Sequence, residues 1–117
     1  MKTVLTIKQS AELIKHGVSE RRATSSVWSP SENAYIHPTF TLTDLLSLLP
    51  KEVIADTRFC KNETCPINIR WDYTMGIWFV VYELVSLPDG IGEDLELINA
   101  LFSTLLWAID HNHVKLD

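Results

Sequence analysis

Cysteine and glycine are scarce in this sequence, which has two cysteines and four glycines among 117 residues. So few cysteines argue against a disulfide-rich scaffold, and so few glycines leave no loop of the kind that cradles a phosphate group. Apolar residues come in short runs, none of which approaches the roughly 18 consecutive residues of a membrane span. Residues 1–6 run into polar sequence too soon for a signal peptide, so we expect a cytoplasmic protein.

The charge balance is acidic but modest, with 10 Lys and Arg against 15 Asp and Glu. A net charge of −5 argues against a protein whose main function is to bind phosphate groups. The chain up to Pro30 carries +3 and the chain from Glu83 onward carries −6, which we interpret as ordinary solvated surface. Hydrophobic residues at 46% and charged residues at 21% are typical of one globular domain, residues 1–117.

The first helix signal lies near the start of the chain. Thr6 and Gln9 have the spacing of a capping box, and apolar residues at helical spacing predict a helix over residues 7–16. Residues 18–33 are rich in Ser, Thr and charge. They predict a short helix from Glu20, followed by a loop.

A second start signal lies at Thr41, with Asp44 three residues later. Phe40 stands where it can pack on Leu45 as a hydrophobic staple. Pro50 cannot continue the helical hydrogen-bond pattern, so we expect a helix of about two turns.

The second half of the chain carries the sheet signals. Residues 66–73 alternate between apolar and polar side chains, which predicts a strand with one buried and one solvated face. Residues 77–84 are apolar on both faces, so we expect a central strand, covered on both sides or paired at a dimer interface. The turn residues at 88–90 end this strand. A shorter strand is expected over residues 53–55. The apolar members of the alternating strand are Ile67, Ile69, Trp71 and Tyr73.

A wide apolar stripe predicts a long helix near the C-terminus, wide enough to roof the sheet. The acidic residues before it, Glu93, Asp94 and Glu96, suit the positive end of a helix. The expected fold is therefore α+β, a small antiparallel sheet with a long C-terminal helix packed across it and two short N-terminal helices. The stripe consists of Leu95, Ile98, Leu101, Phe102, Leu105, Leu106 and Ile109.

Trp107 points away from this stripe on a helical wheel, among the small residues Ala100, Ser103 and Thr104. Small neighbours leave room for a facing side chain, as a two-fold contact requires. We therefore expect Ala100, Ser103, Thr104 and Trp107 to form an interface, most simply in a homodimer. The alternative is that the same chain covers the helix on both sides, through residues 27–28 or the N-terminal helix.

No residue pattern defines an active site, a cofactor site or a metal site, and we expect the protein not to be an enzyme. Cys60 and Cys65 could close a hairpin or supply two zinc ligands, but a structural zinc needs four and no second Cys pair exists. His111 and His113 would complete such a set only if the fold brought them there. We favour two reduced thiols that can be replaced without loss of stability, over a disulfide or a metal site.

Residues 5–28 resemble the start of a helix-turn-helix DNA reader, which provides the alternative function, a DNA-binding accessory factor. Arg21 and Arg22 are the residues that would contact DNA. The segment after them is rich in Ser and Thr and reaches Pro30, so the pattern is degenerate and nucleic-acid binding is not the favoured function.

The order of these motifs resembles small uncharacterised proteins of Bacteroides-type gut bacteria, which often occur in prophage or other mobile-element neighbourhoods. Residues 58–65 depart from that pattern, and the family implies no specific activity. The resemblance implies a non-catalytic interaction or accessory protein of a mobile element, which we expect to be a homo-oligomer without a membrane partner. The motifs that carry it are Gln9-Ser10, Leu13-Ile14, Gly17-Val18, residues 23–28, Phe40-Thr41-Leu42, Leu45-Leu46, Leu48-Leu49-Pro50, Ala100-Leu101 and Leu106-Trp107.

Overall fold

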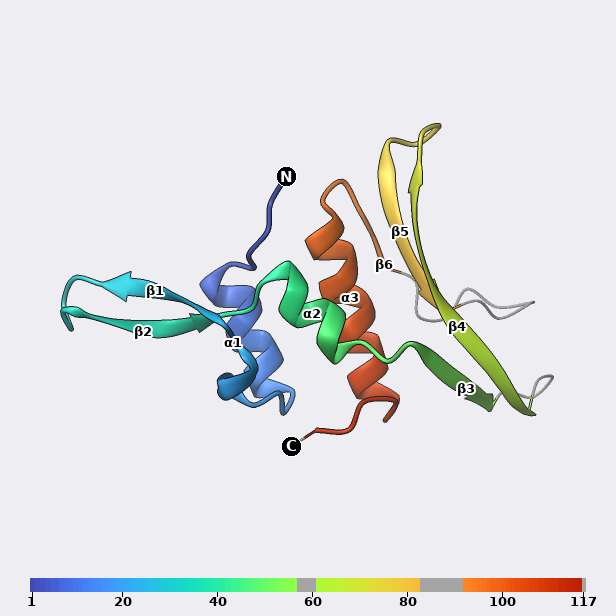
Figure 1. Ribbon diagram of the computed structural model, residues 1–117, viewed down its shortest axis with the longest axis horizontal. Coiled ribbons are helices and arrows are strands. Elements are labelled where there is room, and N and C mark those ends of the chain that lie inside the picture. The colour runs from blue at the N-terminus through green and yellow to red at the C-terminus, as the bar shows by residue number, and fades with distance from the viewer. Residues whose placement is uncertain (57–60, 83–91, 117) are drawn as a thin grey trace.

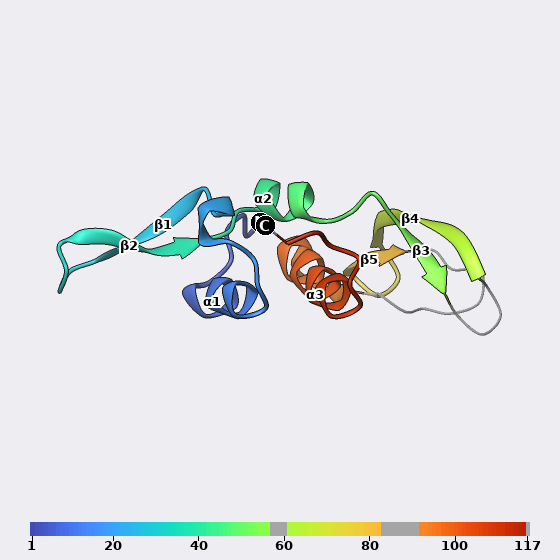
Figure 2. The same cartoon turned by 90° about the horizontal axis from the view of Figure 1, so that it is seen from below.

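The protein is an elongated α+β molecule of 54 × 35 × 17 Å (Figure 1). The computed structural model describes residues 1–56, 61–82 and 92–116. Three helices lie in the middle, a two-stranded hairpin projects at one end, and a four-stranded sheet lies at the other (Figures 1 and 2). In chain order the elements are α1 (Ile7–Lys15), the 3-10 turn η1 (Glu20–Arg22), β1 (Ser25–Ser29), β2 (Ala34–Thr39), α2 (Leu42–Leu48), β3 (Glu52–Asp56), β4 (Lys61–Asp72), β5 (Ile77–Tyr82), β6 (Gly92–Asp94) and α3 (Leu97–Asp110).

Both N-terminal helices begin at the capping boxes that the sequence predicts. The Thr6 hydroxyl accepts from the Gln9 amide, and the Thr41 hydroxyl accepts from the Asp44 amide. Gly17, just after α1, has φ +106°, a conformation that glycine adopts without a steric penalty. The two short helices of the expected fold are thus confirmed.

The four-stranded sheet is antiparallel, in the order β3-β4-β5-β6. The long strand β4 changes partner along its length. Its first half pairs with β3, and its second half pairs with β5 from Ile67 opposite Tyr82 to Asp72 opposite Ile77. The predicted strands over 53–55, 66–73 and 77–84 correspond to β3, β4 and β5, and β5 is central, as expected. Residue 84 and the predicted strand end at 88–90 lie outside the described residues.

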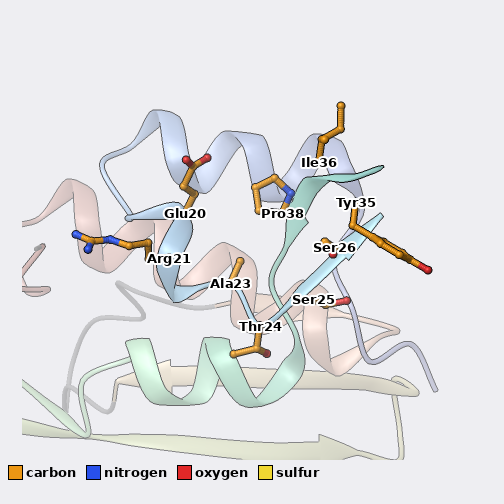
Figure 3. Close-up of a pocket in the computed structure, with 9 residues that line it drawn as sticks. All are labelled: Glu20, Arg21, Ala23, Thr24, Ser25, Ser26, Tyr35, Ile36 and Pro38. Carbon is orange, nitrogen blue, oxygen red and sulfur yellow. The ribbon is translucent and has the colours of Figure 1, made fainter. Parts of the chain in front are cut away.

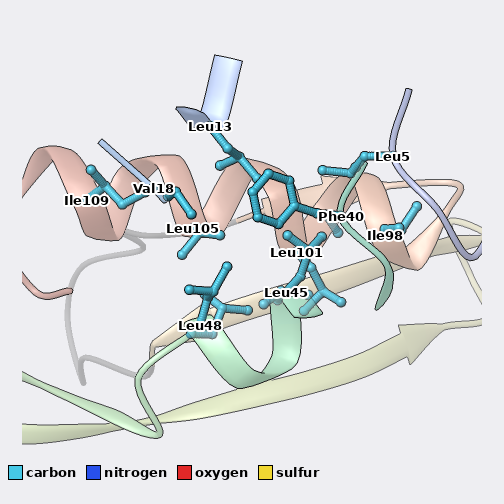
Figure 4. Packing of buried hydrophobic residues seen from close by; sticks show 13 residues of the cluster. Leu5, Leu13, Val18, Phe40, Leu45, Leu48, Ile98, Leu101, Leu105 and Ile109 are labelled. Carbon is cyan, nitrogen blue, oxygen red and sulfur yellow. The ribbon is translucent and has the colours of Figure 1, made fainter. Parts of the chain in front are cut away.

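Helix α3 lies between the other two helices and the sheet. Its apolar stripe packs mainly against α1, α2 and Phe40, in the cluster of Figure 4. Leu95, which the sequence assigns to that stripe, precedes the helix and is 72% exposed. The α+β class is confirmed. The predicted stripe does not mainly cover the sheet, because a different face of α3 packs on it. Buried members of the cluster include Leu13, Val18, Phe40, Leu45, Leu48, Ile98, Leu101, Leu105 and Ile109.

The segment after η1 is a β-hairpin, so the loop predicted there is wrong. Strands β1 and β2 pair antiparallel with a register shift between Val27 and Trp28, and Asn33 in the connection has φ +50°. The shift breaks the period-two pattern that would reveal a strand, and asparagine tolerates the left-handed conformation. The short helix expected from Glu20 is present as the three-residue turn η1.

Candidate interaction surfaces

The β1–β2 hairpin carries a group of large apolar side chains in contact with solvent. We call Val27, Trp28, Tyr35 and Ile36 the hairpin surface; their exposed fractions are 37%, 43%, 67% and 46%. The Trp28 and Tyr35 rings meet edge to face at a centroid distance of 5.0 Å and an interplanar angle of 70°. Such a cross-strand aromatic pair holds both rings in a defined geometry without covering them.

A shallow pocket of about 350 Å³ adjoins the hairpin surface, between η1 and the base of the hairpin (Figure 3). Its lining combines apolar groups, Tyr35 and Ile36 among them, with hydroxyl groups and the charged residues Glu20 and Arg21. Polar groups beside apolar side chains can fix the orientation of a bound partner. The lining residues are Glu20, Arg21, Ala23, Thr24, Ser25, Ser26, Tyr35, Ile36 and Pro38.

The base of the hairpin is anchored to α2 by one buried carboxylate, that of Asp44. It accepts hydrogen bonds from the Thr24 amide at 2.9 Å, the Thr24 hydroxyl at 2.9 Å and the Thr41 amide at 2.9 Å. Burial alone would raise the pKa of Asp44, but these hydrogen bonds outweigh it and hold the pKa below its ordinary value of 3.8. The hairpin therefore projects from a fixed point.

A second set of exposed apolar side chains lies at the far end of the four-stranded sheet. We call Ile69, Trp71, Tyr73 and Met75 the β4 surface; their exposed fractions are 37%, 44%, 84% and 62%. Trp71 lies opposite Trp78 of β5, with ring centroids 5.3 Å apart. The sequence places the alternating apolar residues on one buried face. That prediction is wrong from Ile69 onward, because α3 packs mainly on β5 and β6 and does not extend over this part of β4.

The face of α3 expected to meet a second copy meets the chain's own sheet. Ala100 and Thr104 are fully buried, and the Thr104 hydroxyl donates to the Val80 carbonyl of β5 at 3.0 Å. Trp107 stacks on Tyr82 of β5 at 5.9 Å, and Ser103 alone of the four proposed residues is exposed. Small residues stand at this face because β5 and β6 approach closely. The alternative, a helix covered on both sides by its own chain, is the arrangement present, although the sheet provides the cover.

Aromatic rings continue this packing past the end of α3. Trp107 stacks with His111 at 4.7 Å and with His113 at 5.1 Å. Burial, together with the neighbouring His111, lowers the pKa of His113, and burial raises the pKa of the Tyr82 phenol, whose hydroxyl donates to the Pro50 carbonyl at 2.7 Å. These rings therefore pack against the C-terminal end of α3.

The helix-turn-helix considered as the alternative over residues 5–28 is not formed. Arg21 and Arg22 lie in the single turn η1, and the stretch that would be a recognition helix is strand β1. A recognition helix must be long enough to lie in the major groove, which three residues are not. The DNA-binding hypothesis therefore loses the element on which it depends.

Cys65 is fully buried beside Val53 and Tyr82, and Cys60 lies outside the described residues. The expectation that the cysteines can be replaced without loss of stability assumes exposed side chains, and that assumption is wrong for Cys65. Among the residues that the structure describes, no three His, Cys, Asp or Glu side chains gather as a metal site would need. Within the same residues, no helix has the length and apolarity to cross a membrane.

Compared with protein-family models, with curated proteins and with solved structures, the chain matches none of them. The functional argument therefore rests on the two exposed apolar surfaces and their surroundings.

Proposed function

We propose that this protein is a non-catalytic interaction protein that binds a partner protein through the hairpin surface. The observation that carries the proposal is the exposure of four large apolar side chains, Trp28 and Tyr35 among them, on one projecting hairpin. Exposed apolar groups of this kind mark interaction sites, and Trp and Tyr are the residues most enriched at binding hot spots.

The hairpin's construction supports the proposal. An isolated two-stranded ribbon is marginally stable in water, yet this one is fixed at its base by Asp44 and stiffened by the Trp28–Tyr35 pair. Pre-organised aromatic side chains lose little conformational freedom on binding. Strands β1 and β2 carry no Lys, Arg, Asp or Glu, so the complementary surface is expected to be apolar and weakly charged.

The resemblance to proteins of mobile-element neighbourhoods supports an accessory role in a bacterial mobile element. In that role the protein would act in the cytoplasm as an adaptor, without a cofactor. The hairpin would supply contact area, and the adjoining pocket would supply polar groups that fix the orientation of the partner.

Site-specific photo-crosslinking tests the proposal. A photoreactive phenylalanine analogue replaces Tyr35 in the full chain expressed in its native host, and Ile54 on β3, 58% exposed, is the matched control position. We expect a covalent adduct specific to position 35, with a protein that then binds the purified wild-type chain. Identical adducts from both positions, or an adduct whose protein does not bind the purified chain, would contradict the proposal.

A further inference from the structure

We infer that two copies of this chain pair through the open edge of β4, with Trp71 on the two-fold axis. The inference goes beyond the hairpin-mediated function and concerns the opposite end of the molecule (Figure 1). It also replaces the homodimer expected through Trp107, whose face is occupied by the chain's own sheet.

The second half of β4 has a strand partner on one side. Strand β5 pairs with it from residue 67 to residue 72. On the other side, β3 ends its pairing at Pro66, and the Ile67 amide donates to the Lys51 carbonyl at 2.8 Å. Among the described elements, no strand continues along that side from Ile69 to Asp72. In Figure 1 this part of β4 forms the outer side of a hairpin that extends away from the helices.

The residues along this edge are complementary to themselves. In an antiparallel pair centred on Trp71, Arg70 of one copy faces Asp72 of the other, and the reverse contact repeats it. Trp71 then faces Trp71, and Ile69 lies opposite Tyr73, the first residue of the turn that follows β4 in the second copy. Charged residues thus meet opposite charges on one face of the joined sheet, and apolar residues meet apolar residues on the other.

The charges also select this register from its neighbours. Centring the pair on Arg70 would place two guanidinium groups opposite each other, which is unfavourable. Centring it on Ile69 would leave Asp72 opposite Pro66, without a cation. A shift by a single residue would put apolar side chains against polar ones, because side chains alternate between the two faces of a strand.

Both charged groups can make the contact. Within the described part of the chain, neither Arg70 nor Asp72 forms an ion pair. Asp72 Oδ1 accepts from the amides of Thr74 and Met75, which leaves Oδ2 for a cation across the edge. The Arg70 guanidinium lies over the Phe79 ring at 5.3 Å, an exposed cation–π contact that a long side chain can exchange for a carboxylate.

The joined sheet leaves room for the rest of each copy. Helix α3 packs on β5 and β6, so the two β4 strands would lie between the two copies of α3, in a sheet whose strands are spaced about 4.8 Å apart. Trp71 and Tyr73 are the largest groups covered. Together they expose roughly 250 Å² per copy, which predicts a weak, concentration-dependent dimer rather than an obligate one.

Charge complementation provides the test. Arg70→Glu alone would set a carboxylate at position 70 against Asp72, and Asp72→Lys alone would set an ammonium group at position 72 against Arg70. We expect each variant to dimerise about tenfold more weakly than wild type in sedimentation equilibrium. An equimolar mixture restores two attractive pairs, so it should recover the wild-type association. A wild type that stays monomeric across the micromolar range, or a mixture no better than its components, would overturn the inference.

Asp72→Lys also removes the acceptor of the Thr74 and Met75 amides, so a second experiment avoids that substitution. Trp71→Cys places a thiol on the proposed axis, and mild oxidation should link two copies; Trp78→Cys on β5 and the wild type are the controls. Equal cross-linking of all three proteins would contradict the proposed register. Because Tyr35 lies at the other end of the molecule, loss of the dimer would leave the Tyr35 adduct intact, and failure of one proposal would not imply failure of the other.

Discussion

Replacing Asp44 with Ala should destabilise the protein more than any surface substitution, because this carboxylate joins the hairpin to α2. It is 5% exposed and accepts from two backbone amides and one hydroxyl. Hydrogen bonds to a charged group contribute about 1.5–3 kcal/mol each, and a buried donor left without an acceptor costs about 1–3 kcal/mol. Since these contributions overlap, we expect a loss of about 4 kcal/mol in the free energy of unfolding.

Two further variants separate the contributions of the hydrogen bonds and of the charge to this loss of stability. Thr24→Val removes the hydroxyl donor and keeps the amide, so it should cost about 1 kcal/mol. Asp44→Asn keeps one acceptor oxygen and loses the charge, so it should fall between the two. For a domain of this size, about 1 kcal/mol corresponds to about 4 °C in the unfolding midpoint, which calorimetry resolves.

The pH dependence follows from the direction of the pKa shift. Because the pKa of Asp44 in the folded protein is below 3.8, its contribution is fully present above that pH and is lost as the pH falls through the folded pKa. The stability gap between wild type and Asp44→Asn should be constant from about pH 7 to about pH 5 and should narrow below about pH 4. A gap that is unchanged or wider at low pH, or a loss below about 1 kcal/mol for Asp44→Ala, would refute the reasoning.

Three other substitutions test the packing. Gly92→Ala should cost about 2 kcal/mol in urea unfolding, because a Cβ at that position would overlap the Ala100 carbonyl oxygen; an unchanged midpoint would contradict the close approach of β6 to α3. Thr39→Val should raise the unfolding midpoint by about 4 °C, because the buried Thr39 hydroxyl has no hydrogen-bond partner among the described residues; a fall would show that it has one. Trp107→Ala should lose about 3 kcal/mol through its contact with Tyr82 and leave the association state unchanged, and a stable monomer formed from a dimer would restore the interface hypothesis.

Local signals predict the helices of this chain well. The capping boxes at Thr6 and Thr41 act within one turn, and Pro50 ends α2 through its own backbone, so a single stretch of sequence holds all the information. The positions of β4 and β5 follow in the same way from alternation and from a continuous apolar run, whereas the short strand β6 is not predicted.

The failures involve contacts between distant residues. The hairpin over residues 25–39 depends on pairing across a register shift and on the bond from Thr24 to Asp44, 20 residues away. The two faces of α3 are both apolar or small, and periodicity cannot tell which of them meets the sheet. The face that meets the sheet is the one where Gly92 of β6 approaches Ala100 closely. The periodicity of the helix sequence does not reveal that contact.

The candidate surfaces are likewise predicted only in part from the sequence. The sequence identifies Trp71 and Tyr73 as members of one strand face but assigns that face to the core, because exposure depends on how far α3 extends across the sheet. It places Trp28 in a loop, because the ring that packs on it, Tyr35, belongs to the other strand of a hairpin that the sequence does not reveal. Alternation predicts a face; it does not predict whether another element covers it.

The affinity for the partner captured at position 35 tests the central claim most directly. Isothermal titration calorimetry would compare the wild type with a variant carrying both Trp28→Ser and Tyr35→Ser, and the unfolding midpoints of both would be measured in parallel. Because truncation of hot-spot aromatics costs about 2 kcal/mol or more each, we expect binding to weaken by at least about 100-fold. The midpoint should shift by no more than about 4 °C, since both side chains are largely exposed. Unchanged affinity with a folded variant would contradict the claim that the hairpin surface binds the partner.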